Sequence, residues 1–157
     1  MSVWNILRIG ASALSAQRLR LDVISNNIAN AETTRTAEGG PYRRQDVVFT
    51  PQGTQAFLPQ FLATRRGNEP GRGTGSGQSS GLGGVQAAAI IRSDEPGPRI
   101  YDPSHPDADQ EGYVTYPNVN MVVEMTNMLS ATRSYEAGIS VVEAAKRMAL
   151  RALDIGK

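Results

Sequence analysis

The stretch SALSAQRLRLDVISNNIANAETT, residues 12–34, joins a helical apolar stripe to a run of asparagines. Apolar or small residues recur in alternating steps of four and three, and Gln17 is the only polar interruption. A mean period of about 3.5 residues places them on one helix face, as in a coiled-coil seam. The set is Val3, Leu7, Gly10, Leu14, Leu21, Ile24, Ile28 and Ala31. The sequence therefore predicts a long amphipathic helix whose seam needs a partner helix.

Three asparagines stand at the end of this helix. Asn26, Asn27 and Asn30 fall within five residues, although asparagine is a poor helix former. Helix physics allows a fraying last turn that Asn30 caps. The other interpretation is that the amides bond to neighbouring subunits, and the residues alone leave both open.

The partner helix is expected near the other end of the chain. It begins after Pro117, with Asn118 or Asn120 as its cap, and continues to about Ile155. Its seam again alternates by four and three, with Lys146 as the charged interruption. The seam set is Met121, Met125, Met128, Thr132, Tyr135, Ile139, Val142, Ala149 and Leu153. We expect the two helices to pair as an antiparallel coiled coil.

Further apolar residues lie off both seams. They are Ile6, Ile9, Leu19, Val122, Leu129 and Leu150. A helix pair alone would leave them in water, and exposed apolar surface of this kind marks interaction sites. Both helices therefore look like assembly elements that become ordered when neighbours cover their outer faces.

The chain divides into three regions, 1–31, 32–116 and 117–157. The middle region predicts a small β module, with strands at 43–49, 85–92, 99–101 and 113–116. Its segment 55–64 is interrupted by Pro59 and is either an edge strand or a loop. Residues 67–84 contain eight glycines and predict a flexible loop. The expected fold is mainly α with this small β module.

Composition excludes several classes of function. The chain has no cysteine and one histidine, His105, so thiolate and multi-histidine metal sites are excluded. The 14 arginines and two lysines are spread along the chain, which argues against nucleic-acid binding. No apolar run reaches the ~20 residues of a membrane span. A cleaved secretory signal is not expected, because no basic segment precedes the first apolar residues.

Charge is unevenly distributed along the chain. Residues 92–112 carry six acids and two arginines, whereas residues 1–75 carry nine arginines and five acids. Opposite charge in different regions would let copies or relatives pair head to side, although a solvated surface explains it equally well.

The best candidate for a chemical site is the acidic segment near position 110. Asp107, Asp109, Glu111 and Gly112 match the first half of a calcium loop, but the acid expected at position twelve falls on Asn118. The glycine-rich GRGTGSG lacks the strand and helix of a phosphate loop. His105 has no nearby nucleophile and is expected in a turn. We therefore predict no catalytic, cofactor or metal residue, and no small-molecule substrate.

The opening stretch resembles the N-terminal signature of flagellar rod, hook and hook-associated proteins. TRTAEGGPYRRQDVVF, YDPSHPDADQEGYVTYPNVNMV and MTNMLSATRSYEAGISVVEAAKRMALRALDIGK resemble the proximal-rod members of this family. One position departs from the pattern, since Gly138 stands where a polar residue or asparagine is expected. Glycine inside a helix costs about 1 kcal/mol relative to alanine.

The resemblance implies a structural subunit of the basal-body rod that crosses the periplasm and passes torque outward. It also implies export without a cleaved signal by the flagellar type III apparatus, and partners among copies of itself and other rod subunits. A distal-rod or hook protein and a soluble coiled-coil adaptor are the alternatives. The expected subunit interface consists of Leu7, Leu14, Leu21, Asn26, Asn27, Ile28, Asn30, Met125, Met128, Tyr135, Ile139 and Val142.

Overall fold

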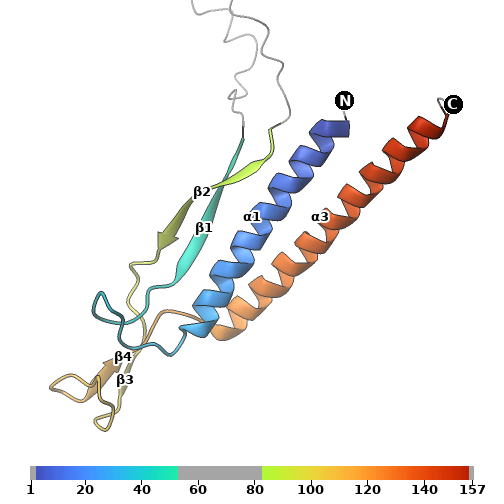
Figure 1. Cartoon of the computed structure of the whole chain (residues 1–157). Helices are drawn as coiled ribbons and strands as arrows, with labels where there is room; N and C mark the ends of the chain where they lie inside the picture. Colours follow the sequence, from blue (N-terminus) through green and yellow to red (C-terminus); the bar gives the residue numbers. More distant parts are fainter. Residues whose placement is uncertain (1–2, 53–82, 156–157) are drawn as a thin grey trace, which may run out of the picture.

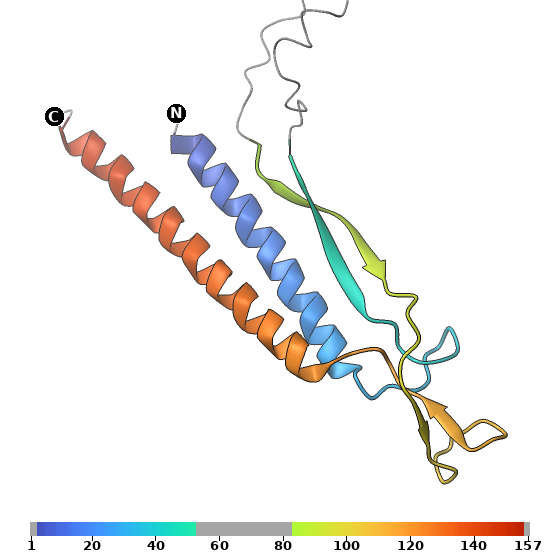
Figure 2. The same cartoon turned by 180° about the vertical axis from the view of Figure 1, so that it is seen from behind.

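The computed structural model describes residues 3–52 and 83–155, and two long helices dominate it. Helix α1 is Val3–Ala29 and helix α3 is Met121–Ile155. They lie side by side, with the first turn of α1 and the last turn of α3 at the same end of the molecule (Figures 1 and 2). Asn120 caps α3, because its Oδ1 accepts the backbone N–H groups of Val122 and Val123 at 3.0 and 3.2 Å.

A two-stranded ribbon covers a second side of α1. Strand β1 (Gln45–Pro51) pairs antiparallel with β2 (Val85–Arg92), from Gln45 opposite Arg92 to Pro51 opposite Val85. Both strands contact α1 and neither contacts α3, so α1 is the central layer of the described part (Figure 1).

The ribbon is fixed to α1 near both of its ends. At one end, Oγ of Ser12 accepts the backbone N–H of Val85 at 3.1 Å. At the other, the side chain of Asn27 bonds to the backbone of Gln45. Fifteen helical residues rise about 22 Å, and six strand steps span about 20 Å. The two attachment points are thus spaced to match the length of the strand.

A smaller hairpin lies at the end of the molecule away from the chain termini. Strand β3 (Arg99–Tyr101) pairs antiparallel with β4 (Tyr113–Thr115) (Figure 2). Gly112 has a φ of 81°, a left-handed conformation that side chains rarely adopt, and it precedes β4. Gly39 and Gly40, also at positive φ, turn the chain between α1 and β1.

The core of the described part is small and lies mainly between α1 and α3, with one further buried residue in β4. Its buried apolar residues are Ala16, Val23, Ile24, Val114, Ala131 and Ala145. Alanines contribute little apolar area, so the helices approach each other closely instead of burying large side chains. Within residues 3–52 and 83–155, no helix combines the length and apolar content of a membrane span.

The structure confirms two long terminal helices with a small β module between them. The strands expected at 85–92 and 99–101 match β2 and β3, while β1 begins two residues later than predicted. Asn120 rather than Asn118 is the cap of α3, and Asn118 instead donates to Glu95. The segment predicted at 55–64 and the glycine-rich loop as far as residue 82 lie outside the described residues.

Candidate assembly interface

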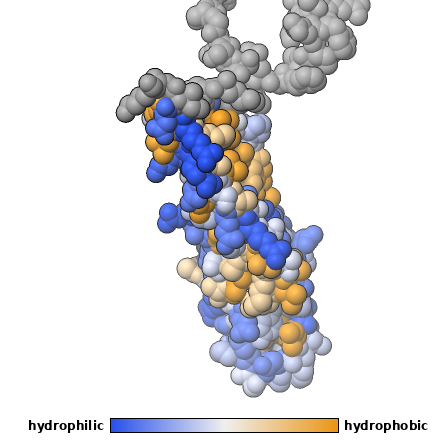
Figure 3. Space-filling view, turned by 90° about the vertical axis from the view of Figure 1, so that its right-hand side faces the viewer, coloured by the Kyte–Doolittle hydropathy of each residue, from blue (hydrophilic) through white to orange (hydrophobic). Residues whose placement is uncertain are grey.

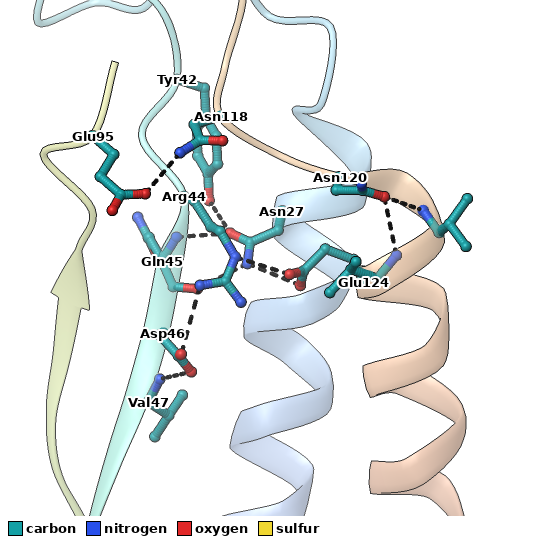
Figure 4. Close-up of polar contacts among 12 residues, drawn as sticks. Asn27, Tyr42, Arg44, Gln45, Asp46, Val47, Glu95, Asn118, Asn120 and Glu124 are labelled. Carbon is teal, nitrogen blue, oxygen red and sulfur yellow. Dashed lines mark hydrogen bonds and ion pairs between the residues drawn. The ribbon is translucent and has the colours of Figure 1, made fainter. Parts of the chain in front are cut away.

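The end of α1, the start of β1 and the start of α3 meet in a polar junction formed by Asn27, Tyr42, Arg44, Gln45 and Glu124 (Figure 4). Asn27 is fully buried at its centre. Its Nδ2 donates to the carbonyl oxygen of Gln45 at 2.8 Å and to Oε2 of Glu124 at 3.2 Å. Its Oδ1 accepts the N–H of Gln45 and the O–H of Tyr42, both at 2.9 Å.

These bonds give Asn27 a definite role within one chain. A side-chain amide has two N–H donors and two acceptor lone pairs, and all of them are used here. Asn27 pairs with the peptide group of Gln45 much as a neighbouring strand would. Within the chain, Tyr42, Gln45 and Glu124 take up all of this hydrogen-bonding capacity, and a bond from the Asn27 amide to a neighbouring subunit stays a prediction.

Glu124 brings a charge into the junction. Its side chain is 1% exposed, and its Oε1 accepts Nε of Arg44 at 2.9 Å. Arg44 is 30% exposed and also lies 3.6 Å from Asp46. A buried carboxylate is tolerated when it is paired and hydrogen-bonded, and removing one partner leaves an uncompensated charge. The pair therefore links the residue before β1 to α3 through electrostatics.

Tyr42 completes the junction from the loop before β1. Burial raises the pKa of its phenol above the ordinary 10.0; the Arg92 charge opposes this shift and the Glu124 charge adds to it. The hydroxyl thus remains a hydrogen-bond donor to Asn27 at neutral pH. Sequence reasoning missed Tyr42, Arg44 and Glu124. The sequence did contain one sign of the junction: Glu124 is a charged residue four positions before Met128, on a helix face that is otherwise apolar.

Below the junction, glycines allow α1 and α3 to approach each other closely. A Cβ added at Gly10 would lie 2.6 Å from Cγ2 of Val142, and one at Gly138 would lie 2.9 Å from Cδ2 of Leu14. Each helix therefore supplies a glycine that receives a side chain of the other. Helix α3 continues unbroken through Gly138, so the unexpected glycine serves helix packing.

At every second position, the face of α3 that meets α1 is shifted by one residue toward the N-terminus from the predicted seam. Met128, Tyr135, Val142 and Ala149 are partly buried, as predicted. Between them the buried positions are Glu124, Ala131 and Ala145, with Gly138 against Leu14. Met125 and Ile139 were expected in the seam and are 56% and 38% exposed, and Leu153 is 71% exposed. Ala131, Gly138 and Ala145 occupy three of these positions because small residues permit close helix approach, and Glu124 belongs to the polar junction.

The predicted interface residues fall into three groups by burial. Asn26, Met125 and Ile139 are exposed, and Asn27 is buried. The remaining residues, Leu7, Leu14, Leu21, Ile28, Asn30, Met128, Tyr135 and Val142, are partly buried. The Nδ2 of Asn30 donates to the carbonyl oxygen of Asn26, as expected of a residue that caps the last turn.

The outer surface of α3 carries exposed apolar side chains near its start, middle and end. Figure 3 shows hydrophobic and hydrophilic residues interspersed on this side of the molecule. Val122, Leu129 and Leu150, predicted to lie off the seam, are 72%, 53% and 53% exposed. By contrast, Ile6, Ile9 and Leu19 on α1 are partly buried. Val123, Val141 and Met148 enlarge the exposed set beyond the prediction. This surface is the candidate for contacts with other subunits.

The acidic segment that resembles half a calcium loop is held by local hydrogen bonds. Asp109 accepts the N–H groups of Glu111 and Tyr113 and the guanidinium of Arg99. The bond from the Tyr113 N–H is the main cause that lowers the pKa of Asp109, against the opposing effect of desolvation. In the described ranges no three carboxylate or imidazole groups converge as metal ligands would.

Two protein-family models match the two ends of the chain, and individual relatives match its whole length. Residues 7–35 match the family described as "Flagella basal body rod protein", and residues 110–155 match "Flagellar basal body rod FlgEFG protein C-terminal". The chain is 42% identical to the flagellar basal-body rod protein FlgC of Borreliella burgdorferi, over 99% of this chain and 98% of that one. It is 39% and 40% identical to the FlgC proteins of Bacillus subtilis and Salmonella typhimurium, over the full length of each. The chain therefore belongs to the FlgC family of flagellar basal-body rod proteins.

Proposed function

We propose that this structural rod protein assembles through α1 and α3 into the helical tube of the proximal rod, and that the tube transmits torque across the periplasm. Membership of the FlgC family supports the place in the rod. The observation that carries the assembly role is the outer surface of α3, where large apolar side chains remain exposed from Val122 to Leu150. A helix that forms one side of a small core has no structural need for them.

We further propose that α1 and α3 form an antiparallel coiled coil within each subunit. Three contacts support a constant register along the pair. Gly10 meets Val142, Leu14 meets Gly138, and Asn27 bonds to Glu124. In each pair the residue numbers sum to nearly the same value, as they must when two helices run in opposite directions. The polar junction would fix this register at one end, since a shift by one turn breaks its bonds.

The proposed partners are copies of this chain and other rod subunits. The exposed members of the expected interface, Asn26, Met125 and Ile139, are available for these contacts. The chain would reach the rod through the flagellar type III export apparatus. A small core and alanine-rich helix packing suit a chain that travels unfolded and becomes rigid when neighbours cover its helices.

Cysteine crosslinking in cells tests the assembly role. The chain has no cysteine of its own, so single cysteines at Leu129 and Ala131 report without background. These positions are two residues apart on α3, and they are 53% and 0% exposed. The variants would be expressed in a motile bacterium that lacks its own copy of the protein, and motility would confirm rod formation.

We expect the cysteine at Leu129 to crosslink to other rod subunits, and the buried one at Ala131 to form no crosslink to them. Equal crosslinking from the two positions in motile cells would contradict assembly through the outer face of α3. Failure of the unaltered chain to restore rods would contradict the rod function itself.

A further inference from the structure

The two ends of the elongated molecule carry different surfaces (Figures 1 and 2). The hairpin end consists of β3, β4 and the loops beside them. Its apolar side chains Ile100, Tyr101 and Tyr113 are 50%, 63% and 39% exposed. Tyr101 and Tyr113 pack edge to face against each other, with ring centroids 5.3 Å apart. Their outer surfaces and Ile100 remain exposed and are available for a contact.

The hairpin end is also strongly acidic. Residues 93–112 contain six carboxylates and one arginine. Three of the carboxylates pair with arginines, at Asp94, Asp107 and Asp109. Glu95, Asp102 and Glu111 form no ion pair within the described part of the chain, and they leave negative charge around the apolar side chains.

The helix end, where α1 begins and α3 finishes, has the complementary character. Trp4, Met148, Leu150 and Leu153 are 79%, 61%, 53% and 71% exposed there. Arg8, Lys146, Arg147 and Arg151 lie among them in the sequence, against one acid, Asp154, after residue 145. None of these basic side chains forms an ion pair with another described residue. Figure 3 shows hydrophilic and hydrophobic patches next to each other along this part of α3.

We propose that the hairpin end of one copy docks on the helix end of a second copy, head to tail. This inference rests on the proposed assembly function and names one of its contacts. Both surfaces have the composition of an interface, with aromatic and apolar side chains surrounded by charge. The charges are opposite, which aligns the partners and favours this pairing over pairing between like ends.

The second copy is the occupant because one chain carries both complementary surfaces at opposite ends. An anionic membrane or a nucleic acid would suit the basic helix end but would leave the acidic hairpin end without a partner. A contact between two different surfaces does not close on itself and continues as an open array. Axial growth of a rod requires such a contact.

A pair of complementary variants tests the proposal. Trp4→Gln, Arg147→Glu and Arg151→Glu together block the helix end. Ile100→Thr and Glu111→Arg together block the hairpin end. All five positions are exposed, so folding should persist and is checked by circular dichroism. A control variant, Ile90→Thr with Arg18→Glu, changes the same kinds of side chain at exposed positions of β2 and α1, away from both ends and from the outer surface of α3.

Sedimentation velocity at low salt provides the readout. We expect the wild type and the control to form larger species as concentration rises, and these species to dissociate in about 0.5 M salt, where exposed charges are screened. Each blocked variant alone should be monomeric. An equimolar mixture of the two should form a one-to-one dimer, because each variant retains one intact end.

A mixture that remains monomeric, or a blocked variant that still forms large species, would overturn the proposal. So would a wild-type chain that stays monomeric at every concentration. The rod function is decided separately by whether the unaltered chain restores rods in cells, so each claim can fail without the other.

Discussion

Replacing Asn27 by alanine should cost the folded chain about 3 kcal/mol of unfolding free energy. The substitution removes four hydrogen bonds from a fully buried side chain. Ordinary hydrogen bonds contribute about 1 kcal/mol each, and a bond to a carboxylate such as Glu124 about 1.5 to 3, so the gross loss is roughly 5 kcal/mol. Water should recover part of it, because a cavity of about 120 Å³ touches both Gln45 and Glu124.

Urea unfolding followed by circular dichroism would measure this loss, with Asn26→Ala as the matched control. Asn26 is the preceding residue, is exposed, and its side chain accepts a single hydrogen bond from Asn30. We expect the control to lose less than about 1 kcal/mol. A loss for Asn27→Ala no greater than that of Asn26→Ala would refute the view that the polar junction holds the helices and the ribbon together.

Three further predictions concern the seam and the junction. Gly10→Ala should destabilise the chain by about 1 kcal/mol, since overpacking against Val142 costs about 2 and helix propensity returns about 1. In a Val142→Ala background the same change should be stabilising, and a double-mutant cycle of unfolding free energies would show whether the sign reverses. Gln17→Met should raise the unfolding free energy by about 1 kcal/mol, because the buried Oε1 of Gln17 has no hydrogen-bond partner in the described part of the chain; a loss of stability would contradict this. Burial raises the pKa of Tyr42 above 10.0, so the stability that its protonated hydroxyl gives is complete below pH 10 and falls as pH rises further. Tyr42→Phe should lack this part of the alkaline loss when unfolding is compared between pH 9 and 11, and identical profiles would exclude the bond to Asn27 as its source.

Much of the architecture followed from residue patterns. The four-and-three spacing from Val3 to Ala31 predicted α1, and the proline and glycine positions bounded the strands of the middle region. These features are local, because periodicity and turn residues act within a few positions of one another. The asparagine run was recognised as unusual, but its partners could not be read from the sequence. They lie 15 to 97 residues away along the chain.

The sequence by itself determined that two long terminal helices with apolar faces flank a small β module. The spacing of apolar residues that distinguishes a helix from a strand is a property of each segment separately. Only the tertiary structure decided which face of α3 meets α1. That choice depends on the fit between two helices, and Leu14 against Gly138 and Val142 against Gly10 favoured a face of small residues over the larger Met125 and Ile139. The same packing brought Glu124 beside Asn27 and Arg44, where a buried charge is stable only because three distant segments supply its partners.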